Sequence, residues 1–240
     1  MGLTTWLVAY YKFDGWSTDS FGSYNLTNDW ATQTTGNWWK LGECYDFDGI
    51  NDYLYRSDAL WIAGANSISI QTRIKVDGTA WAGHYIFHLS TTSGKNQYSI
   101  VYDNSTWSWW VDKISFWRTR DYIDAYIAPY AITLNNSLRY HAVLTYNSSN
   151  WTIYWYLDWT EVTTRPSSSW NGSGTWYGNV VSIWKMLEPW NYYNWDWKID
   201  EVWVWNRCLS ATEVAELYNG GSGLTYPFKA PITFGMFTDQ

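Results

Sequence analysis

Two short segments of the sequence are dense in aromatic side chains and lie beside Asn, Ser and Asp. They contain Trp107, Trp109 and Trp110 in one segment and Trp190, Tyr192, Tyr193 and Trp195 in the other. Such rings stack on the apolar faces of sugars, while nearby Asp and Asn oxygens accept hydrogen bonds from sugar hydroxyls. These residues are therefore candidates for a ligand-binding platform. For Trp107 and Trp109 the alternative is that they form the core-facing side of a strand.

The acidic residues do not form a recognisable catalytic pair. The sequence contains six Glu, namely Glu43, Glu161, Glu188, Glu201, Glu213 and Glu216. A retaining glycosidase needs two carboxyl groups about 5–5.5 Å apart, and no Glu-x-Asp-x-x-Glu run supplies them. Asp200 and Glu201 are adjacent, so regular strand geometry points them to opposite faces. The sequence also lacks a Gly-x-Ser-x-Gly elbow and a phosphate loop, and we expect no catalysis.

His and Cys residues do not predict a transition-metal site. His84 and His88 are four residues apart, which in a strand separates them by about 13 Å and prevents them from sharing one ion. Cys44 and Cys208 are the only two cysteines and match no motif spacing. We expect them not to form a disulfide.

Composition excludes two classes of partner. The chain has 240 residues and a net charge of −7, with 22 Trp, 21 Tyr and 8 Phe but only 15% charged residues. An acidic balance argues against nucleic-acid binding, and no apolar run approaches the roughly 20 residues that span a bilayer. The residues from Met1 to Trp6 do not resemble a secretory signal.

Short alternating segments, separated by Gly, Asn, Asp and Ser, must position these side chains. They predict a two-sheet β-structure, and the expected strands run over residues 7–13, 44–47, 53–55, 67–76, 85–89, 98–102, 107–111, 140–146, 151–157, 180–184 and 198–205. Residues 67–76 alternate most regularly. One helix is expected after Ser210, with Glu213 completing a capping box and Asn219-Gly220-Gly221 ending it. Residues 112–139 fit the alternation poorly, and we expect the charged run Trp117–Asp121 to be a solvated loop.

Six Asn-x-Ser/Thr sequons predict exposed loops if the host glycosylates proteins. They begin at Asn25, Asn104, Asn135, Asn147, Asn150 and Asn171.

Four segments in order resemble the concanavalin A-like jelly-roll domains of the laminin-G and pentraxin type. They are Leu7–Gly15 with Asp19–Asn25, Asp46–Tyr53, Leu138–Tyr146 leading to Asp158, and the most specific one, Ile199–Asn219. The resemblance implies two antiparallel sheets packed face to face with one short C-terminal helix, and a function in recognition of glycans or proteins. We expect this domain to occupy residues 1–220.

The resemblance also implies a structural calcium ion, held by Asp19 and Asp200 with backbone oxygens near Gly22 and Asn25. Such an ion would join the two ends of the chain, and hard cations take oxygen ligands of this kind. The alternative is that Asp19 caps a turn and that Asp200 is merely hydrogen-bonded. The resemblance further implies that His141 is a structural core residue.

Two positions depart from the family pattern, which has Gly in both places. Trp159 follows Asp158, and Trp197 precedes Lys198. Both departures suggest Trp at exposed turns.

Together these observations predict a calcium-stabilised adhesion domain that binds carbohydrate or a surface glycoprotein, outside a cell or on a virion. The alternative is a structural subunit of a virion or extracellular filament. In that case the Trp surface and the tail, residues 221–240, would make subunit contacts. The tail is apolar after a glycine hinge, so it could fold back as an edge strand or reach a neighbouring subunit.

Overall fold

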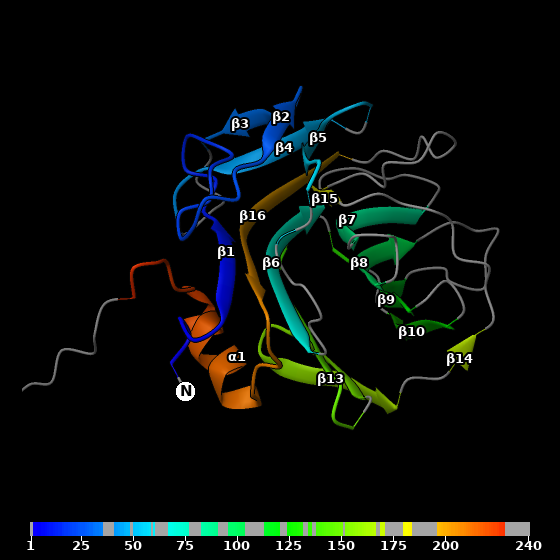
Figure 1. Ribbon diagram of the computed structural model, residues 1–240. Coiled ribbons are helices and arrows are strands. Elements are labelled where there is room, and N and C mark those ends of the chain that lie inside the picture. The colour runs from blue at the N-terminus through cyan, green and yellow to red at the C-terminus, as the bar shows by residue number, and fades with distance from the viewer. Residues whose placement is uncertain are drawn as a thin grey trace, which may run out of the picture.

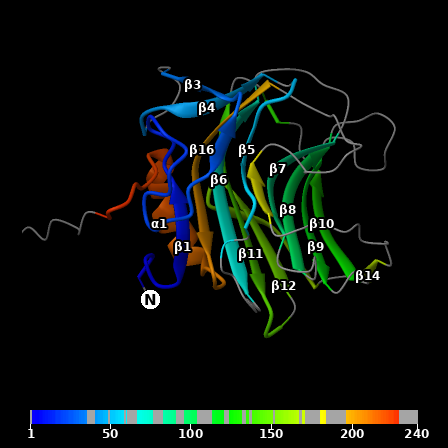
Figure 2. The ribbon, with the colours of Figure 1, turned by 45° about the horizontal axis from the view of Figure 1, so that its top comes forward.

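Two antiparallel β-sheets pack face to face (Figures 1 and 2). The computed structural model describes residues 2–35, 41–48, 50–58, 60, 67–76, 83–90, 96–103, 113–120, 124–131, 134–135, 138–150, 152–166, 169–170, 180–183 and 196–228. The predicted all-β sandwich with one short C-terminal helix is confirmed in this part of the chain.

The first sheet carries the helix on its outer face. Along the sheet its strands are β13 (Thr160–Pro166), β12 (Thr152–Leu157), β11 (Arg139–Asn147), β6 (Ile68–Val76), β16 (Asp196–Trp205), β4 (Cys44–Asp48) and β3 (Thr32–Thr34). A further strand, β1 (Leu7–Tyr11), pairs with the C-terminal half of β16, whereas β4 pairs with its N-terminal half.

The second sheet also has eight strands. In order they are β14 (Ser169–Trp170), β10 (Asp124–Ala131), β9 (Lys113–Arg120), β8 (Asn96–Asp103), β7 (Gly83–Ser90), β15 (Val180–Ile183), β5 (Tyr53–Arg56) and β2 (Thr27–Asp29). The expected loop at Trp117–Asp121 is therefore wrong, because β9 and β10 form an antiparallel hairpin over much of residues 112–139. The charged residues at the end of β9 interrupt the alternation from which strands were predicted.

The main core lies between the sheets. In β6 the predicted apolar face is buried at Ile68, Ile70 and Ile74. The opposite face of the same strand is also buried, at Gln71 and Arg73, because it lies beneath the elements that cover the outer side of this sheet.

The helix α1 (Ala211–Tyr218) begins and ends as the sequence predicts. The Ser210 side chain accepts a hydrogen bond from the Glu213 backbone, and Glu213 reaches back to complete the capping box. Asn219 adopts the left-handed conformation that ends the helix, and a short 3₁₀ turn, η2 (Asn219–Gly221), follows. Arg207 donates two hydrogen bonds to the Glu213 carboxylate and one to the carbonyl of Thr5, which joins the helix to the N-terminal segment.

A second apolar cluster fills the space between α1 and the outer face of the first sheet. Trp203 is stacked against Tyr10, Trp205 and Phe228, with ring centroids 3.7, 5.6 and 5.3 Å apart. Tyr226 packs edge-on against Phe21. The tail as far as Phe228 therefore folds back onto its own chain, across the sheet and not as an edge strand of it.

Candidate functional site

The predicted aromatic platform lies outside the described residues. This holds for all seven of its members, Trp107, Trp109, Trp110, Trp190, Tyr192, Tyr193 and Trp195, and also for the strand expected at 107–111. The platform stays a prediction.

Exposed Trp side chains are nevertheless present elsewhere. Trp16, Trp30 and Trp159 are 74, 73 and 54% exposed, and Trp6 is exposed as well. Of the two departures from the family pattern, Trp159 confirms the expectation of an exposed turn. Trp197 does not, because it lies inside β16 and is fully buried in the main core, where it packs against Tyr102.

Trp159 occupies the tight turn between β12 and β13. Asp158 and Trp159 have φ values of 48° and 68°, the left-handed conformations of a two-residue hairpin turn that favours Asn-Gly or Asp-Gly. The N–H of His141 donates to the Asp158 carboxylate at 2.9 Å, which holds the turn against β11. The indole of Trp159 then lies near the Tyr218 ring, at 6.5 Å between centroids.

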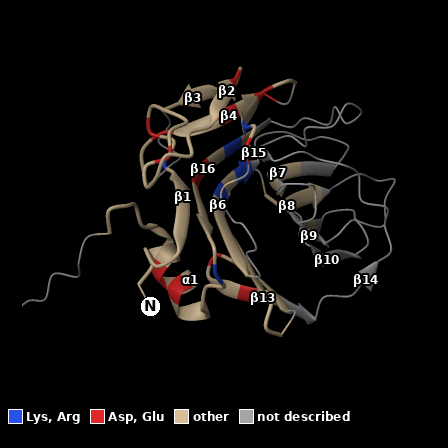
Figure 3. Ribbon diagram, in the orientation of Figure 1, with Lys and Arg blue, Asp and Glu red and all other residues tan. Residues whose placement is uncertain are grey.

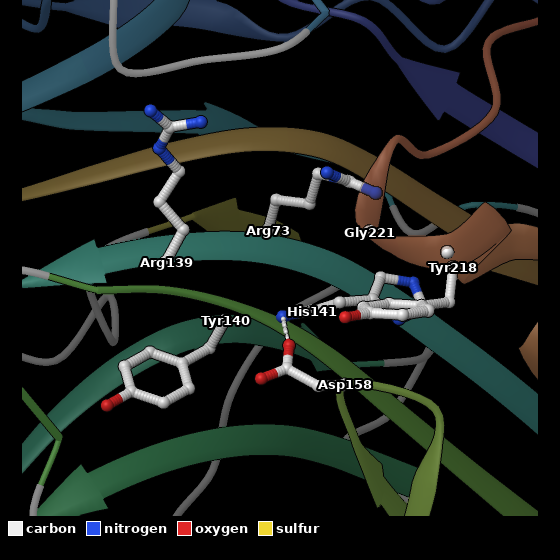
Figure 4. A pocket seen from close by; sticks show the side chains of 8 residues that line it. Arg73, Arg139, Tyr140, His141, Asp158, Tyr218 and Gly221 are labelled. Carbon is white, nitrogen blue, oxygen red and sulfur yellow. Dashed lines mark hydrogen bonds between the residues drawn. The ribbon is translucent and has the colours of Figure 1, made fainter.

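A cavity of about 240 Å³ opens between this turn and the C-terminal end of α1. We call it the helix-end cavity, and its lining residues are Arg73, Arg139, Tyr140, His141, Asp158, Tyr218, Gly220 and Gly221. Figure 4 shows Arg73 extending towards Gly221 and the Tyr218 ring lying over His141. Sites for drug-sized ligands occupy about 300–1,000 Å³, so this cavity suits something as small as one sugar ring.

Arg73 is buried in this cavity with an unsatisfied guanidinium. It is 8% exposed, its Nη2 atom has no hydrogen-bond partner, and no salt bridge joins it to a carboxylate among the described residues. A side chain at Gly223 would overlap the guanidinium, so the glycine makes room for it. Figure 3 shows basic residues on β6 and β16, whereas acidic residues mark α1.

His141 is a core residue, as the resemblance implies, but it is not a satisfied one. Both ring nitrogens are buried without partners. Burial, with a smaller contribution from the positive charge of Arg73, lowers the pKa of His141 to about 3. The imidazole is therefore neutral at pH 7 and presents one donor and one acceptor.

Asp200 and Glu201 contradict the expectation that they point to opposite faces. A β-bulge in β16 between Asp200 and Trp203, with Glu201 at φ 52°, inserts one extra residue. Ile199 and Val202 both face the main core, so the two carboxyl groups between them lie on the outer side. Tyr10 donates a 2.5 Å hydrogen bond to Glu201.

Burial governs the charge of this carboxyl pair. It raises the pKa of Glu201 to about 8 and the pKa of Asp200 well above its usual range, where the Glu201 charge adds to the effect. Both groups are electrostatic neighbours of Arg73. Asp158 is a third electrostatic neighbour of Arg73, and it lines the same cavity.

The predicted calcium ligands differ in what they can offer to an ion. Asp19 accepts hydrogen bonds from the N–H groups of Tyr10, Phe21 and Tyr24, and its own N–H donates to Asn25. These are the bonds of a turn cap, and they occupy both carboxylate oxygens. Asp200 keeps one buried oxygen, Oδ2, without a partner. Asp19 thus already holds its turn together, whereas Asp200 keeps an oxygen open to a cation.

Calcium at Asp19, Gly22, Asn25 and Asp200 stays a prediction from the resemblance. Among the described residues, no three His, Cys, Asp or Glu side chains come together to hold a metal ion. His88 is buried and hydrogen-bonded to Ser99 at 2.7 Å, and burial lowers its pKa to about 4. Cys44 and Cys208 do not form a disulfide.

Four sequons fall in the described part of the chain. Asn25, Asn135 and Asn150 are exposed and Asn147 is partly so, whereas Asn104 and Asn171 lie outside it. No described helix is long and apolar enough to cross a membrane.

Comparison with known proteins places this geometry in a familiar fold. A profile for the concanavalin A-like lectin/glucanases superfamily matches residues 48–215. Comparison of the sequence with curated proteins found no match.

Similar solved structures include three proteins of different kinds. Trypanosoma rangeli sialidase has a TM-score of 0.64 and 14% identity over 92% of this chain, but this chain spans about a third (34%) of the sialidase. Domain 4 of the extracellular arabinanase AbnA from Geobacillus stearothermophilus, in complex with arabinotriose, has a TM-score of 0.64 and 15% identity over 88% of this chain and 97% of that one. The binding domain of botulinum neurotoxin serotype D has a TM-score of 0.65 and 10% identity over 89% of this chain and 51% of that one.

Proposed function

Because the chain belongs to the concanavalin A-like lectin/glucanase superfamily, we propose that it is a non-catalytic recognition domain whose helix-end cavity binds carbohydrate. One observation carries this proposal. Arg73 and His141, which line the cavity, carry buried polar atoms without partners, and the exposed ring of Trp159 lies beside the lining residue Tyr218. Unsatisfied buried polar groups are rare in native proteins and call for an explanation, and a polar ligand provides one.

The residues in and beside the cavity can contact different parts of a sugar. Trp159 and Tyr218 offer aromatic faces to the C–H surface of a ring. Asp158 accepts hydrogen bonds from hydroxyl groups, and neutral His141 donates one and accepts another. Rigid elements hold each group in place, since Arg73 and His141 lie on β6 and β11 and Tyr218 ends α1.

This arrangement favours binding over hydrolysis. Asp158 is the one carboxylate among the lining residues of the helix-end cavity, whereas glycoside hydrolysis ordinarily needs two. The Asp200–Glu201 pair does not line it. The proposed recognition of sugar does not depend on the predicted calcium ion.

Two further considerations support a lectin-like role outside a cell or on a virion. Three sequons begin at exposed Asn residues, Asn25, Asn135 and Asn150, as glycosylation in an extracellular setting requires. Domain 4 of the arabinanase, which has a similar fold over nearly its whole length, was solved with arabinotriose. The alternative, a structural assembly subunit, is tested below through the tail.

A glycan array tests the proposal. We expect the wild-type protein to bind a subset of glycans and Trp159→Ala to lose that binding. Trp16→Ala removes another exposed indole, one that makes no ring contact with Tyr218 in the described part of the chain, and it should bind as wild type does. If Trp159→Ala still binds glycans, the binding site lies elsewhere on the protein. If the wild-type protein binds no glycan, the proposal is refuted.

A further inference from the structure

The guanidinium of Arg73 is the feature that the proposed function leaves unexplained. A neutral sugar needs no fixed positive charge, and burying an unpaired charge is costly because water no longer solvates it. Arg73 lines the helix-end cavity and is more than nine-tenths buried. Its Nη2 atom has no hydrogen-bond partner.

Carboxyl groups near Arg73 offset part of its charge, and Asp158 is the one among them that lines the same cavity. Asp200 and Glu201 interact with Arg73 electrostatically, but neither forms a salt bridge with it in the described part of the chain. Their oxygens Asp200 Oδ2 and Glu201 Oε1 are themselves unpaired.

A second guanidinium lines the same cavity. Arg139 lies on β11, two residues from His141, and is partly buried. Burial lowers the pKa of Arg139, as it does that of Arg73, because the charged form is poorly solvated there. An anionic ligand would favour the charged form of both.

We propose that the ligand of the helix-end cavity is an acidic sugar, whose carboxylate binds to Arg73 and Arg139. The inference rests on the proposed carbohydrate-binding function and names its ligand class. The planar guanidinium matches a carboxylate in two parallel hydrogen bonds. Asp158 and His141 then serve the hydroxyl groups, and Trp159 and Tyr218 the ring. A single carboxylate fits better than a dianion, because Asp158 already places one negative charge in the cavity.

Binding of matched acidic and neutral sugars to the full chain tests this inference. The probes are trigalacturonic acid and a glycan ending in N-acetylneuraminic acid, each with its carboxyl-reduced counterpart, and a sulfated galactose trisaccharide. Since the carboxylate adds charge-assisted hydrogen bonds, we expect at least one acid to bind about tenfold or more tightly than its reduced form. Its affinity should weaken as salt rises.

Variants distinguish recognition of the carboxylate from recognition of the sugar itself. Arg73→Gln and Arg139→Gln should each weaken binding of the acid more than binding of the reduced sugar, so that the preference for the acid is lost. Arg56→Gln is the control, because Arg56 pairs with Asp58 and does not line the cavity. Arg139 is less buried than Arg73, so Arg139→Gln keeps the test valid if Arg73→Gln unfolds.

The outcomes are distinguishable. Equal binding of acid and reduced sugar, lost in Trp159→Ala, would overturn the acidic-sugar inference and leave the proposed function standing. Binding of the sulfated trisaccharide alone would overturn the carboxylate assignment. No binding of any sugar would overturn both.

Discussion

Two hydrogen bonds of 2.9 Å join His141 and Asp158. The N–H of His141 donates to the Asp158 carboxylate, and the N–H of Asp158 donates to the His141 carbonyl. The turn that carries Trp159 is thereby fixed to the strand that carries His141. The Asp158 side chain thus both fixes the shape of the helix-end cavity and lines it.

Replacing Asp158 should separate these two roles. Asp158→Ala removes the acceptor of a part-buried N–H, so we expect a loss of about 1–3 kcal/mol in the free energy of unfolding together with loss of sugar binding. Asp158→Asn keeps an acceptor oxygen and should stay within about 1 kcal/mol of wild type while binding more weakly. Denaturant unfolding and titration calorimetry measure the two effects, and an unstable Asn variant would contradict this account.

Trp159→Gly should make the protein more stable and less able to bind. A left-handed conformation costs an L-residue about 1–2 kcal/mol, and glycine adopts it without strain. We expect the free energy of unfolding to rise by about 0.5–1 kcal/mol and sugar binding to be lost. Trp30→Gly is the matched control, since Trp30 has φ 69° and is exposed but, among the described residues, makes no ring contact with Tyr218. It should gain stability and keep binding, and a Trp159→Gly protein that binds normally would refute the role of the indole.

Stability should fall as pH rises from about 6.5 to 8. Burial raises the pKa of Glu201 to about 8 from an ordinary 4.5, so in this range the folded protein holds a proton that the unfolded chain has released. One such group lowers the free energy of unfolding by at most about 1.4 kcal/mol per pH unit. The lowered pKa values of His88 and His141 act in the opposite direction, but only below their unfolded pKa of about 6.5.

Glu201→Gln isolates this effect. Its unfolding free energy, measured by denaturant titration at pH 6.5, 7.25 and 8, should vary less than that of wild type. A wild-type stability that increases with pH over this range would show that Glu201 is ionised in the folded protein.

Removing the tail before Gly221 should destabilise the fold. Phe228 is stacked on Trp203 and Tyr226 on Phe21, and the loss of these partly buried rings should lower the free energy of unfolding by about 2–4 kcal/mol. Light scattering should give one mass for both proteins, and Phe228→Ala should show a smaller effect of the same sign. A mass that falls on truncation while stability stays unchanged would instead favour the assembly role.

Asp19→Ala should be destabilising whether calcium is present or not. The Asp19 carboxylate accepts three backbone N–H groups, and leaving them without an acceptor should lower the unfolding free energy by about 2–4 kcal/mol. We expect Asp19→Ala to lower the melting temperature by a similar amount in calcium and in chelator. A calcium-dependent rise in melting temperature that Asp19→Ala abolishes would establish the metal site predicted from the resemblance.

The sequence predicts the framework because the framework depends on local patterns. Alternation places Ile68, Ile70 and Ile74 in the core, and the pair Ser210 and Glu213 starts the helix. The bulge at Glu201 escapes prediction because one inserted residue shifts the side-chain alternation without any change in composition.

The helix-end cavity could not be predicted because its parts are distant in sequence. Arg73, His141, Asp158 and Tyr218 come from four elements and meet only in the folded chain. Arg73 stands in a regular strand pattern where a charged residue ordinarily faces water, and its burial follows from the helix end that covers it. The one local indication of a site here is the turn at Trp159, where Trp replaces the Gly of the family pattern.

The structure of a complex tests the central claim most directly. Crystals of the full chain grown with its tightest-binding glycan should show a sugar ring beside Trp159 and Tyr218, with a carboxylate on the guanidinium of Arg73 and a hydroxyl on Asp158. A sugar bound instead at Trp107–Trp110 or Trp190–Trp195, with the helix-end cavity empty, would contradict the account and return the site to the platform predicted from the sequence.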